Sequence, residues 1–430
     1  MNKKRVAFKT LGCRLNQFET DSIITDFSKA GYEIVPFHAP ADVYIVNTCT
    51  VTNQSDQKSK NTINQAVRHA GNGGITIVTG CMVTSQQEYL ENRSDLTYVV
   101  GNKEKSSVFP LVDAHLKGEI LHPNDLKQDL FNFTVVEDGM HTRSMIKIQD
   151  GCNNYCTYCI VPKVRGRANS RPVQDVLDNI RQVVDLGRKE VVLTGVNISR
   201  YRSEGLSFED LIEKILVLPG DFRVRISSME PEGFTEKFID LFQNPKLCQH
   251  LHLCLQSGSE KVLDLMRRFY SIDQYRSLID TFRNKYPNFN FTTDIIVGFP
   301  GETEELFAES YKTVREIGFG HIHTFKYSVR RGTLAEKMPG QVNEKVKTER
   351  SELIRQLSDE SKYHYRQSLI GKEQMLLVEK PEGGLKASGY GENFVPVWVK
   401  GHTLAKNSFQ KVVISEVLND KDKTVLAKLV

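Results

Sequence analysis

The sequence predicts an α/β protein in three parts: an N-terminal parallel α/β sheet, a central partial (β/α)6 barrel and a small C-terminal antiparallel β-barrel. Three observations support this prediction. Strand and helix patterns alternate near the start, a second series of strand candidates begins near residue 142, and short strands with turn residues follow residue 371. Because 430 residues exceed one ordinary core, we expect three domains, at 1–130, 138–368 and 369–430.

The composition is that of a globular protein, with 39% hydrophobic and 26% charged residues. No segment has the apolar length of a signal peptide or a membrane helix, so we expect a cytoplasmic protein without a membrane partner. The net charge of +4 neither requires nor excludes a nucleic-acid ligand. Eight cysteines in a reducing compartment favour metal binding over disulfides.

The N-terminal part contains three strand candidates that each end at a cysteine: VAFKTLGC (6–13), VYIVNTC (43–49) and ITIVTGC (75–81). The stretches ETDSIITDFSKAGY and KSKNTINQAVRHAG between them have helical periodicity. This order predicts a parallel sheet, whose ligands collect at the carboxyl ends of its strands. We therefore expect Cys13, Cys49 and Cys81 to lie close together.

The central part repeats the alternation of strands and helices, which predicts the partial barrel with its functional residues at the carboxyl ends of the strands. The segment 343–369 is charged and free of glycine, which predicts a helix that stops before Gly371. The strand candidates of the barrel are 144–149, 190–195, 222–228, 250–256, 291–297 and 321–327.

A strong motif follows the first barrel strand. QDGCNNYCTYCIVPKVRGR places Cys152, Cys156 and Cys159 in a CxxxCxxC spacing on one short loop. Structural zinc sites usually take four ligands in two separated pairs, whereas this loop offers three thiolates and no nearby histidine. A 4Fe-4S cluster with one iron left open fits these three ligands better.

This loop resembles the radical-SAM superfamily, in which the open iron binds S-adenosylmethionine (SAM). The resemblance implies cleavage of SAM to a 5′-deoxyadenosyl radical and places Tyr158 against the adenine. The loop together with KTLGCRLNQFETD, NTCTVT and TGC resembles the methylthiotransferase family, and this resemblance covers essentially the whole chain. That family implies an auxiliary 4Fe-4S cluster on Cys13, Cys49 and Cys81, and a C-terminal TRAM-like barrel that binds RNA.

The resemblance also suggests which residues contact SAM at the ends of the later strands. Polar groups there suit the ribose and the amino acid part of SAM, and an arginine suits its carboxylate. As polar residues also cap strand ends for structural reasons, a purely structural role stays open for each. The candidates are Tyr158, Gly195, Asn197, Glu230, Gln256, Ser257, Asp294 and Arg330.

The basic loop KVRGRANSR follows the cysteine motif and is expected at the mouth of the barrel. Charge runs are usually solvated faces, but this position favours RNA contacts by Lys163, Arg165, Arg167 and Arg171. Phe394, Trp398 and Phe409 of the last domain could stack on bases, although aromatic residues in so small a barrel are more often core.

Two features depart from the family pattern. TGCMVTSQQ lacks a GCYAQ-like continuation, and Cys254 stands where proline is usual. Neither departure removes a proposed ligand. Cys248 and Cys254 are expected to be ordinary buried residues.

The GCRLNQFE stretch is more similar to the subfamily that acts on threonylcarbamoyladenosine in tRNA (MtaB-like) than to the isopentenyladenosine branch or the ribosomal-protein branch. The implied reaction inserts a methylthio group at C2 of the adenine at position 37, beside the anticodon. It implies the tRNA anticodon stem-loop, a flavodoxin- or ferredoxin-type electron donor and a sulfur source as partners. The alternatives are the other two methylthiotransferase substrates and, in a different class, a non-catalytic iron-sulfur protein that binds RNA or senses redox state.

Overall fold

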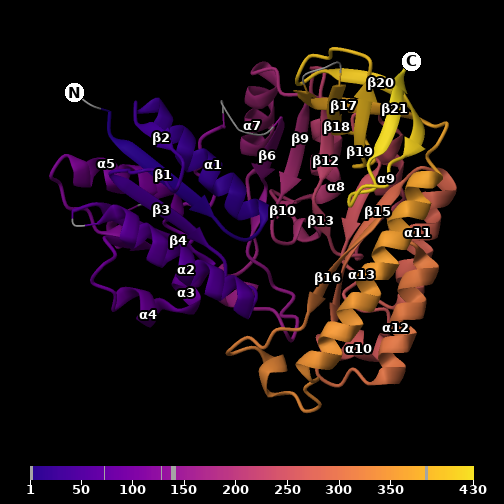
Figure 1. Ribbon diagram of the computed structural model, residues 1–430, viewed down its shortest axis with the longest axis horizontal. Helices are drawn as coiled ribbons and strands as arrows, with labels where there is room; N and C mark the ends of the chain where they lie inside the picture. The colour runs from indigo at the N-terminus through magenta and orange to yellow at the C-terminus, as the bar shows by residue number, and fades with distance from the viewer. Residues whose placement is uncertain (1–2, 72, 127, 137–141, 383–385) are drawn as a thin grey trace.

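The computed structural model describes residues 3–71, 73–126, 128–136, 142–382 and 386–430. Figure 1 shows the three predicted parts: the N-terminal sheet on the left, the partial barrel in the centre and right, and the small barrel at the upper right. The expected domain boundary at residue 138 lies outside the described residues. None of the described helices is long and apolar enough to cross a membrane.

The N-terminal domain is a five-stranded parallel sheet in the order β2-β1-β3-β4-β5. Strands β3 and β4 are buried along their whole length, as expected for inner strands of a parallel sheet that is covered on both faces. Helices pack on both faces of this sheet. The strands are β1 (Arg5–Thr10), β2 (Glu33–Val35), β3 (Val43–Thr48), β4 (Ile75–Gly80) and β5 (Tyr98–Val100); the helices are α1 (Arg14–Lys29), α2 (Asn53–Ala70), α3 (Cys81–Ser85), α4 (Gln87–Glu91), η1 (Lys105–Ser107), α5 (Val108–Leu116) and η2 (Pro123–Asp125).

The central domain confirms all six strand candidates. Its strands pair in the orders β6-β9-β12 and β13-β14-β15-β16, and all of these pairs are parallel. The third strand of the barrel is interrupted at Ser227, between β12 and β13. The two sheets are therefore consecutive parts of one curved array. The strands are β6 (Arg143–Lys147), β9 (Glu190–Thr194), β12 (Arg223–Ile226), β13 (Ser228–Met229), β14 (His250–Leu253), β15 (Asn290–Val297) and β16 (His321–Lys326).

The barrel is open, because β6 and β16 do not pair within the described part of the chain. The N-terminal domain lies beside this opening: α1 packs against β6, and the backbone N of Asn53 in α2 donates to Ser328 Oγ, 3.0 Å away, just after β16. The other elements are α6 (Val161–Val164), α7 (Val173–Asp185), η3 (Ile198–Arg200), α8 (Phe208–Leu216), α9 (Glu236–Asp240), η4 (Leu241–Gln243), α10 (Glu260–Met266), α11 (Ile272–Lys285), α12 (Glu304–Ile317), η5 (Leu334–Lys337), and the short strands β7 (Gln149–Asp150), β8 (Asn169–Ser170), β10 (Arg202–Ser203) and β11 (Leu206–Ser207).

The predicted charged helix is α13 (Glu344–Gln367), which leads into a closed barrel in the order β17-β18-β19-β21-β20. Four of its pairs are antiparallel, as expected, but β19 and β21 are parallel. A parallel closing pair is possible because β20 lies between them in the sequence. The strands are β17 (Glu373–Glu382), β18 (Lys386–Tyr390), β19 (Pro396–Lys400), β20 (Phe409–Val417) and β21 (Val425–Leu429).

The small barrel sits on the amino-terminal ends of the central strands. Arg223 and Arg225 at the start of β12 share the buried carboxylate of Glu190, with the closest atoms 2.6 and 2.9 Å apart. Their remaining N–H groups donate to backbone carbonyls of the small barrel, including those of Tyr390 and Glu392 at 3.0 Å. The small barrel therefore caps the end of the central domain opposite its cysteine loop.

Candidate active site

The CxxxCxxC loop follows β7 and turns sharply at Gly151. Gly151 has a φ of +70°, and a Cβ there would lie 2.0 Å from the carbonyl oxygen of Arg167, so only glycine fits. The loop then turns back on itself, with the Cys159 N–H donating to the Cys156 carbonyl at 3.0 Å. Burial raises the pKa of the Cys159 thiol to about 12, and the thiols of Cys156 and Cys152 contribute to the rise. The three thiols are therefore close enough to interact.

Arg268 contacts this loop and was not a candidate from the sequence. Its Nη1 donates to Cys156 Sγ at 3.2 Å, its Nη2 is paired with the Glu230 carboxylate, and its Nε donates to the Tyr270 hydroxyl at 3.2 Å. A guanidinium beside a cysteine sulfur stabilises the thiolate that a metal needs. The predicted residue Glu230 thus lies near the loop, where it holds this arginine.

Asn197 and Gly195 lie where the sequence predicted them, beside the cysteine loop at the end of β9. The amide Nδ2 of Asn197 is 3.8 Å from Cys152 Sγ, and its backbone N–H donates to Gln149 Oε1 at 2.7 Å. Its buried Oδ1 has no hydrogen-bond donor among the described residues. A buried acceptor next to these thiols fits a ligand with an amino group, such as SAM. A Cβ on Gly195 would lie 2.8 to 3.0 Å from Ile198 and Gln149, so this turn is tightly packed.

Three further SAM candidates, Tyr158, Gln256 and Ser257, make contacts within the protein. Tyr158 packs edge-on against Phe299, with ring centroids 6.2 Å apart. Gln256 has a positive φ of 69° and pairs with β15 through its backbone, while the Ser257 hydroxyl accepts from the Ser259 N–H at 3.3 Å.

Asp294 belongs to a hydrogen-bonded group on β14 and β15. Its Oδ1 lies 3.2 Å from His252 Nε2, and the other ring nitrogen of His252 is 2.9 Å from Thr292 Oγ1. With Cys254, these two residues bring one ligand atom each to within 4.8 Å of one another. Both nitrogens of His252 already have partners, so hydrogen bonds account for this group. Cys248 and Cys254 are both buried, as predicted.

Arg330 lies between the central domain and the N-terminal domain. Its Nη2 forms an ion pair of 2.8 Å with Asp56, and the two terminal nitrogens also donate to Asn53 and Thr50 of the N-terminal domain. The structure therefore places this guanidinium at the domain interface, where its two terminal nitrogens bind protein acceptors and its buried Nε has no partner among the described residues.

The three N-terminal cysteines do converge at the carboxyl edge of their sheet. Cys13 follows β1, Cys49 follows β3 and Cys81 follows β4. A Cβ on Gly12, which has a φ of +98°, would lie 2.8 Å from the sulfur of Cys49. Burial raises the pKa of the Cys49 thiol, and the neighbouring thiols of Cys81 and Cys13 raise it further. The three cysteines thus lie at the same edge of the sheet, where their thiols influence one another.

The two cysteine groups face each other across the domain interface. Cys81 packs with Ile160 and Val164 of the segment that follows Cys159. Asn102 joins the two sides, because its Nδ2 donates to the Val164 carbonyl at 2.9 Å and lies 3.8 Å from Cys81 Sγ. The site is thus built from loops of two domains.

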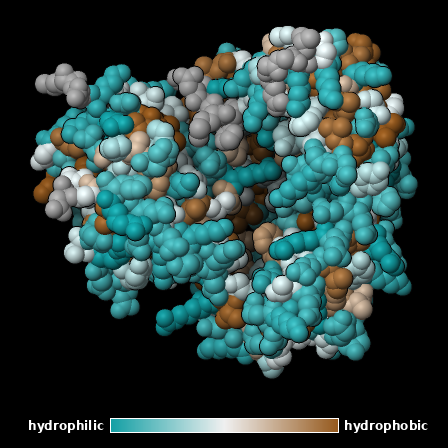
Figure 2. Space-filling view, viewed as in Figure 1, coloured by the Kyte–Doolittle hydropathy of each residue, from teal (hydrophilic) through white to brown (hydrophobic). Residues whose placement is uncertain are grey.

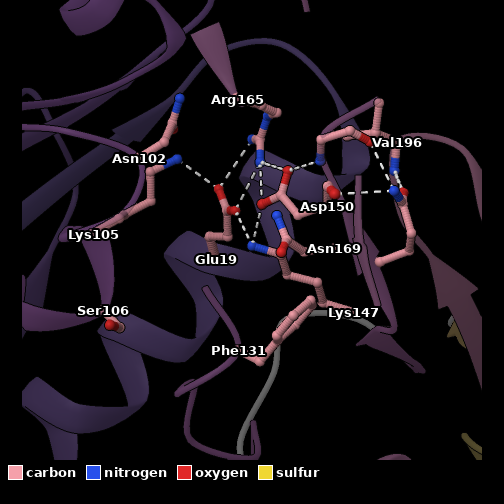
Figure 3. A network of polar contacts seen from close by, with 12 residues as sticks. Glu19, Asn102, Lys105, Ser106, Phe131, Lys147, Asp150, Arg165, Asn169 and Val196 are labelled. Carbon is pink, nitrogen blue, oxygen red and sulfur yellow. Dashed lines mark hydrogen bonds and ion pairs between the residues drawn. The ribbon is translucent and has the colours of Figure 1, made fainter. Parts of the chain in front are cut away.

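A buried ion network lies directly behind both cysteine groups. Figure 3 shows Lys105, Lys147 and Arg165 pointing toward the carboxylates of Glu19 and Asp150. Lys105 and Lys147 approach Glu19 at 2.6 and 2.8 Å, and Arg165 lies 3.1 Å from Glu19 and 2.9 Å from Asp150. These side chains are at most 2% exposed. Glu19 and Lys105 belong to the N-terminal domain, whereas the other three residues belong to the central domain.

The charges of this network are unequal, with three cations against two carboxylates. Burial alone would raise the pKa of Glu19, but Arg165, Lys105 and Lys147 outweigh it and hold that pKa well below its usual range. Burial would also lower the pKa of Arg165, yet Glu19 and Asp150, followed by the thiols of Cys81 and Cys13, raise it. The surplus positive charge lies beside the thiols of Cys81 and Cys13.

Of the four basic residues predicted to contact RNA, Arg165 is the clearest exception, because the ion network buries it. Arg171 is half-buried, with its Nη1 2.8 Å from Asn179 Oδ1. Lys163 and Arg167 are exposed, and the Lys163 ammonium group donates to the Gly332 carbonyl. Only these last two remain available on the surface.

The aromatic residues of the small barrel are not core residues. Phe394, Trp398 and Phe409 are all half-buried and lie outside the apolar core of that barrel. Each lies under a cation: Arg225 is 4.7 Å from the Phe394 ring centroid, Lys386 is 3.3 Å from that of Trp398, and Arg223 is 5.4 Å from that of Phe409.

The fold and the cysteine loop define the class of the protein, an enzyme of the radical-SAM type. The Radical SAM superfamily matches residues 146–314, and Uncharacterized protein family UPF0004 matches residues 5–101. The chain belongs to the radical-SAM methylthiotransferase family. It is 37% identical to the Threonylcarbamoyladenosine tRNA methylthiotransferase MtaB of Bacillus subtilis (92% of this chain, 90% of that protein) and 35% identical to the protein of the same name from Thermotoga maritima (91% and 90%).

A second kind of relative is named for a different modified base. The tRNA-2-methylthio-N(6)-dimethylallyladenosine synthase of Fusobacterium nucleatum is 33% identical over 96% of this chain and 97% of its own. Among solved structures, the radical S-adenosylmethionine methyltransferase TsrM from Kitasatospora setae matches with a TM-score of 0.53 at 13% identity, covering 75% of this chain and 73% of that one. This likeness supports the fold alone. The expectation of a radical-SAM methylthiotransferase is therefore confirmed at the level of the family.

Proposed function

We propose that this enzyme inserts a methylthio group at C2 of N6-L-threonylcarbamoyladenosine at position 37 of tRNA, with SAM and two 4Fe-4S clusters as cofactors. The observation that carries the proposal is the pair of cysteine groups that face each other across α3 and α6, in a chain that belongs to this family. The substrate rests on the GCRLNQFE stretch and on the MtaB relatives at 37% and 35% identity. The expected domain limits at 1–130, 138–368 and 369–430 are part of the proposal.

Each group of residues has a task in this proposal. Cys152, Cys156 and Cys159 hold the cluster that binds SAM, and Cys13, Cys49 and Cys81 hold the auxiliary cluster. When bound, SAM and the clusters supply a carbon-centred radical for hydrogen abstraction and the sulfur to be transferred. The chain's own groups prepare the site: Arg268 donates to the sulfur of Cys156, and Asn197 offers a free buried acceptor beside Cys152.

RNA binding is assigned to the open side of the barrel. Lys163 and Arg167 lie exposed just past Cys159, where they could contact phosphates. The exposed position of Cys13, in contrast to the buried Cys49 and Cys81, leaves the N-terminal group open toward the same side. An external electron donor and a sulfur source complete the proposal.

The substrate is tested by expression of the enzyme in a bacterial host that lacks its own tRNA methylthiotransferases. Digested tRNA is then analysed by liquid chromatography and mass spectrometry. We expect the methylthio derivative of threonylcarbamoyladenosine to appear with the wild-type chain, and not with Cys152→Ala. A methylthio derivative of isopentenyladenosine alone would replace the proposed substrate, and unchanged tRNA would contradict the proposal altogether.

The second cluster is tested by Gly12→Ala. A Cβ at this position would press on Cys49 and displace a ligand, so anaerobically reconstituted protein should fall from about eight iron atoms per chain toward about four. Gly31→Ala is the matched control, because Gly31 also has a positive φ (+87°) but nothing lies within 4 Å of its new Cβ. Full iron content in Gly12→Ala, or an equal loss in Gly31→Ala, would oppose the assignment.

A further inference from the structure

One arginine beside the N-terminal cysteines has no role in the proposed cluster chemistry. Arg14 follows Cys13 directly, and its guanidinium lies 5.4 Å from the ring centroid of Phe394 in the small barrel. Arg14 is exposed to solvent, yet the surrounding protein lowers its pKa by burial, and Arg143 and Arg225 lower it further. Figure 2 shows a hollow between the N-terminal domain and the barrel.

The other arginines of this group have acidic partners. Arg143 lies 4.8 Å from the Tyr390 ring centroid and forms an ion pair of 2.8 Å with Glu379. Arg225 packs on Phe394 and is bound to Glu190 at 2.9 Å. Among the described residues, no hydrogen bond or ion pair is made by the guanidinium of Arg14, which only rests on the aromatic ring.

The guanidinium of Arg14 is exposed and makes no ion pair within the described part of the chain, so it can accept an anionic ligand. The ring of Phe394 holds the guanidinium in place without using its N–H groups. Those five donors stay free in a planar arrangement that suits a carboxylate. The free donors of Arg14 therefore suit an anionic ligand.

The following step rests on the proposed function. Threonylcarbamoyladenosine carries the carboxylate of threonine on N6, whereas the isopentenyl group of the alternative substrate is uncharged. C2 and C6, which carries N6, lie on either side of N1 in the same ring of the base. A long side chain that starts next to a cluster cysteine can therefore reach the substituent while the cluster faces C2. We propose that Arg14 binds the threonine carboxylate and thereby selects this base.

The test is a double-mutant cycle between enzyme and substrate. Anticodon stem-loop RNAs carry either threonylcarbamoyladenosine or its analogue in which the carboxylate is a neutral carboxamide. Methylthiolation is measured as kcat/KM for the wild type, Arg14→Gln and Arg14→Lys. We expect Arg14→Gln to lower kcat/KM on the acid by about 10- to 150-fold, as for a lost charge-assisted hydrogen bond, with Arg14→Lys in between. On the carboxamide, wild type and Arg14→Gln should be equal.

Two further measurements separate a specific role from a structural one. Iron content and formation of 5′-deoxyadenosine should be the same in Arg14→Gln and wild type. Arg143→Gln removes another cation that lies over the rings of Tyr390 and Phe394. It should change kcat/KM by the same factor on the acid and the carboxamide RNA. Equal losses on both RNAs for Arg14→Gln, as a phosphate contact or a folding defect would give, would overturn the proposal. If the wild type modified neither RNA, the proposed function itself would fail, whatever Arg14 does.

Discussion

Cys152→Ala is expected to abolish formation of 5′-deoxyadenosine from SAM under reducing, anaerobic conditions, with a loss of roughly a thousandfold or more. Three thiolates on one loop are needed to hold the SAM cluster, and a two-cysteine loop leaves a further iron without its ligand. Cys49→Ala is expected to give the opposite pattern. It should retain cleavage of SAM and lose transfer of the methylthio group, because Cys49 belongs to the other domain.

Both products are measured in the same reaction, 5′-deoxyadenosine by chromatography and the modified base by mass spectrometry of the RNA. Cys248→Ala is the matched control, since this buried cysteine lies outside both groups and its loss should leave both products near wild-type levels. Methylthiolation at the wild-type rate by Cys49→Ala would refute the role given to the N-terminal cysteines. Abundant 5′-deoxyadenosine from Cys152→Ala would refute the role of the loop.

Glu19→Gln should lower the free energy of unfolding by about 3 to 5 kcal/mol, the usual cost of removing one partner from a buried ion pair. The neutral amide would leave Lys147 and Arg165 with only the carboxylate of Asp150, and it would remove the ion pair that Lys105 makes with Glu19. Urea unfolding of the anaerobically reconstituted protein at pH 7 measures the change. Glu316→Gln is the control: its ion pair with Arg276 is exposed, so its loss should change stability by less than about 1 kcal/mol.

The pH dependence of this difference has a defined sign. The folded pKa of Glu19 lies well below its ordinary value, so its contribution is fully present above the unfolded carboxyl pKa of about 4.3. It is lost as the pH falls from there toward the folded pKa. The difference in free energy of unfolding between wild type and Glu19→Gln should therefore stay constant from pH 7 to pH 5. A gap that closes within that range, or a change below 1 kcal/mol at pH 7, would contradict the proposed strength of the network.

Most of the fold could be predicted from local patterns. The six central strands lie close to their predicted positions, because continuous apolar runs separated by helical periodicity are typical of buried parallel strands. The convergence of Cys13, Cys49 and Cys81 could also be predicted, since strand ends of one parallel sheet meet at one edge. The parallel pairing of β19 with β21 could not, because short strands of similar composition fit several pairings.

The parts that the sequence did not reveal depend on contacts between distant residues. Glu19 reads as an ordinary helix residue, and its partner Arg165, 146 positions away, reads as part of a basic surface loop. Only the packing of the two domains buries both. Arg268 carries no motif of its own, and Arg330 was expected near SAM but is bound to Asp56 of the N-terminal domain. Burial of a charged side chain is decided by its partners, and those lie in other domains here.

The buried network has a consequence for turnover. It ties the helix that begins after Cys13 to the loop that carries Cys159, and pulling them apart would leave several charges unpaired in the interior, at a cost of several kcal/mol. This cost favours a fixed arrangement of the N-terminal and central domains over a hinge that opens between them. Under the proposed function, the RNA base would then enter a gap whose width the buried network holds constant.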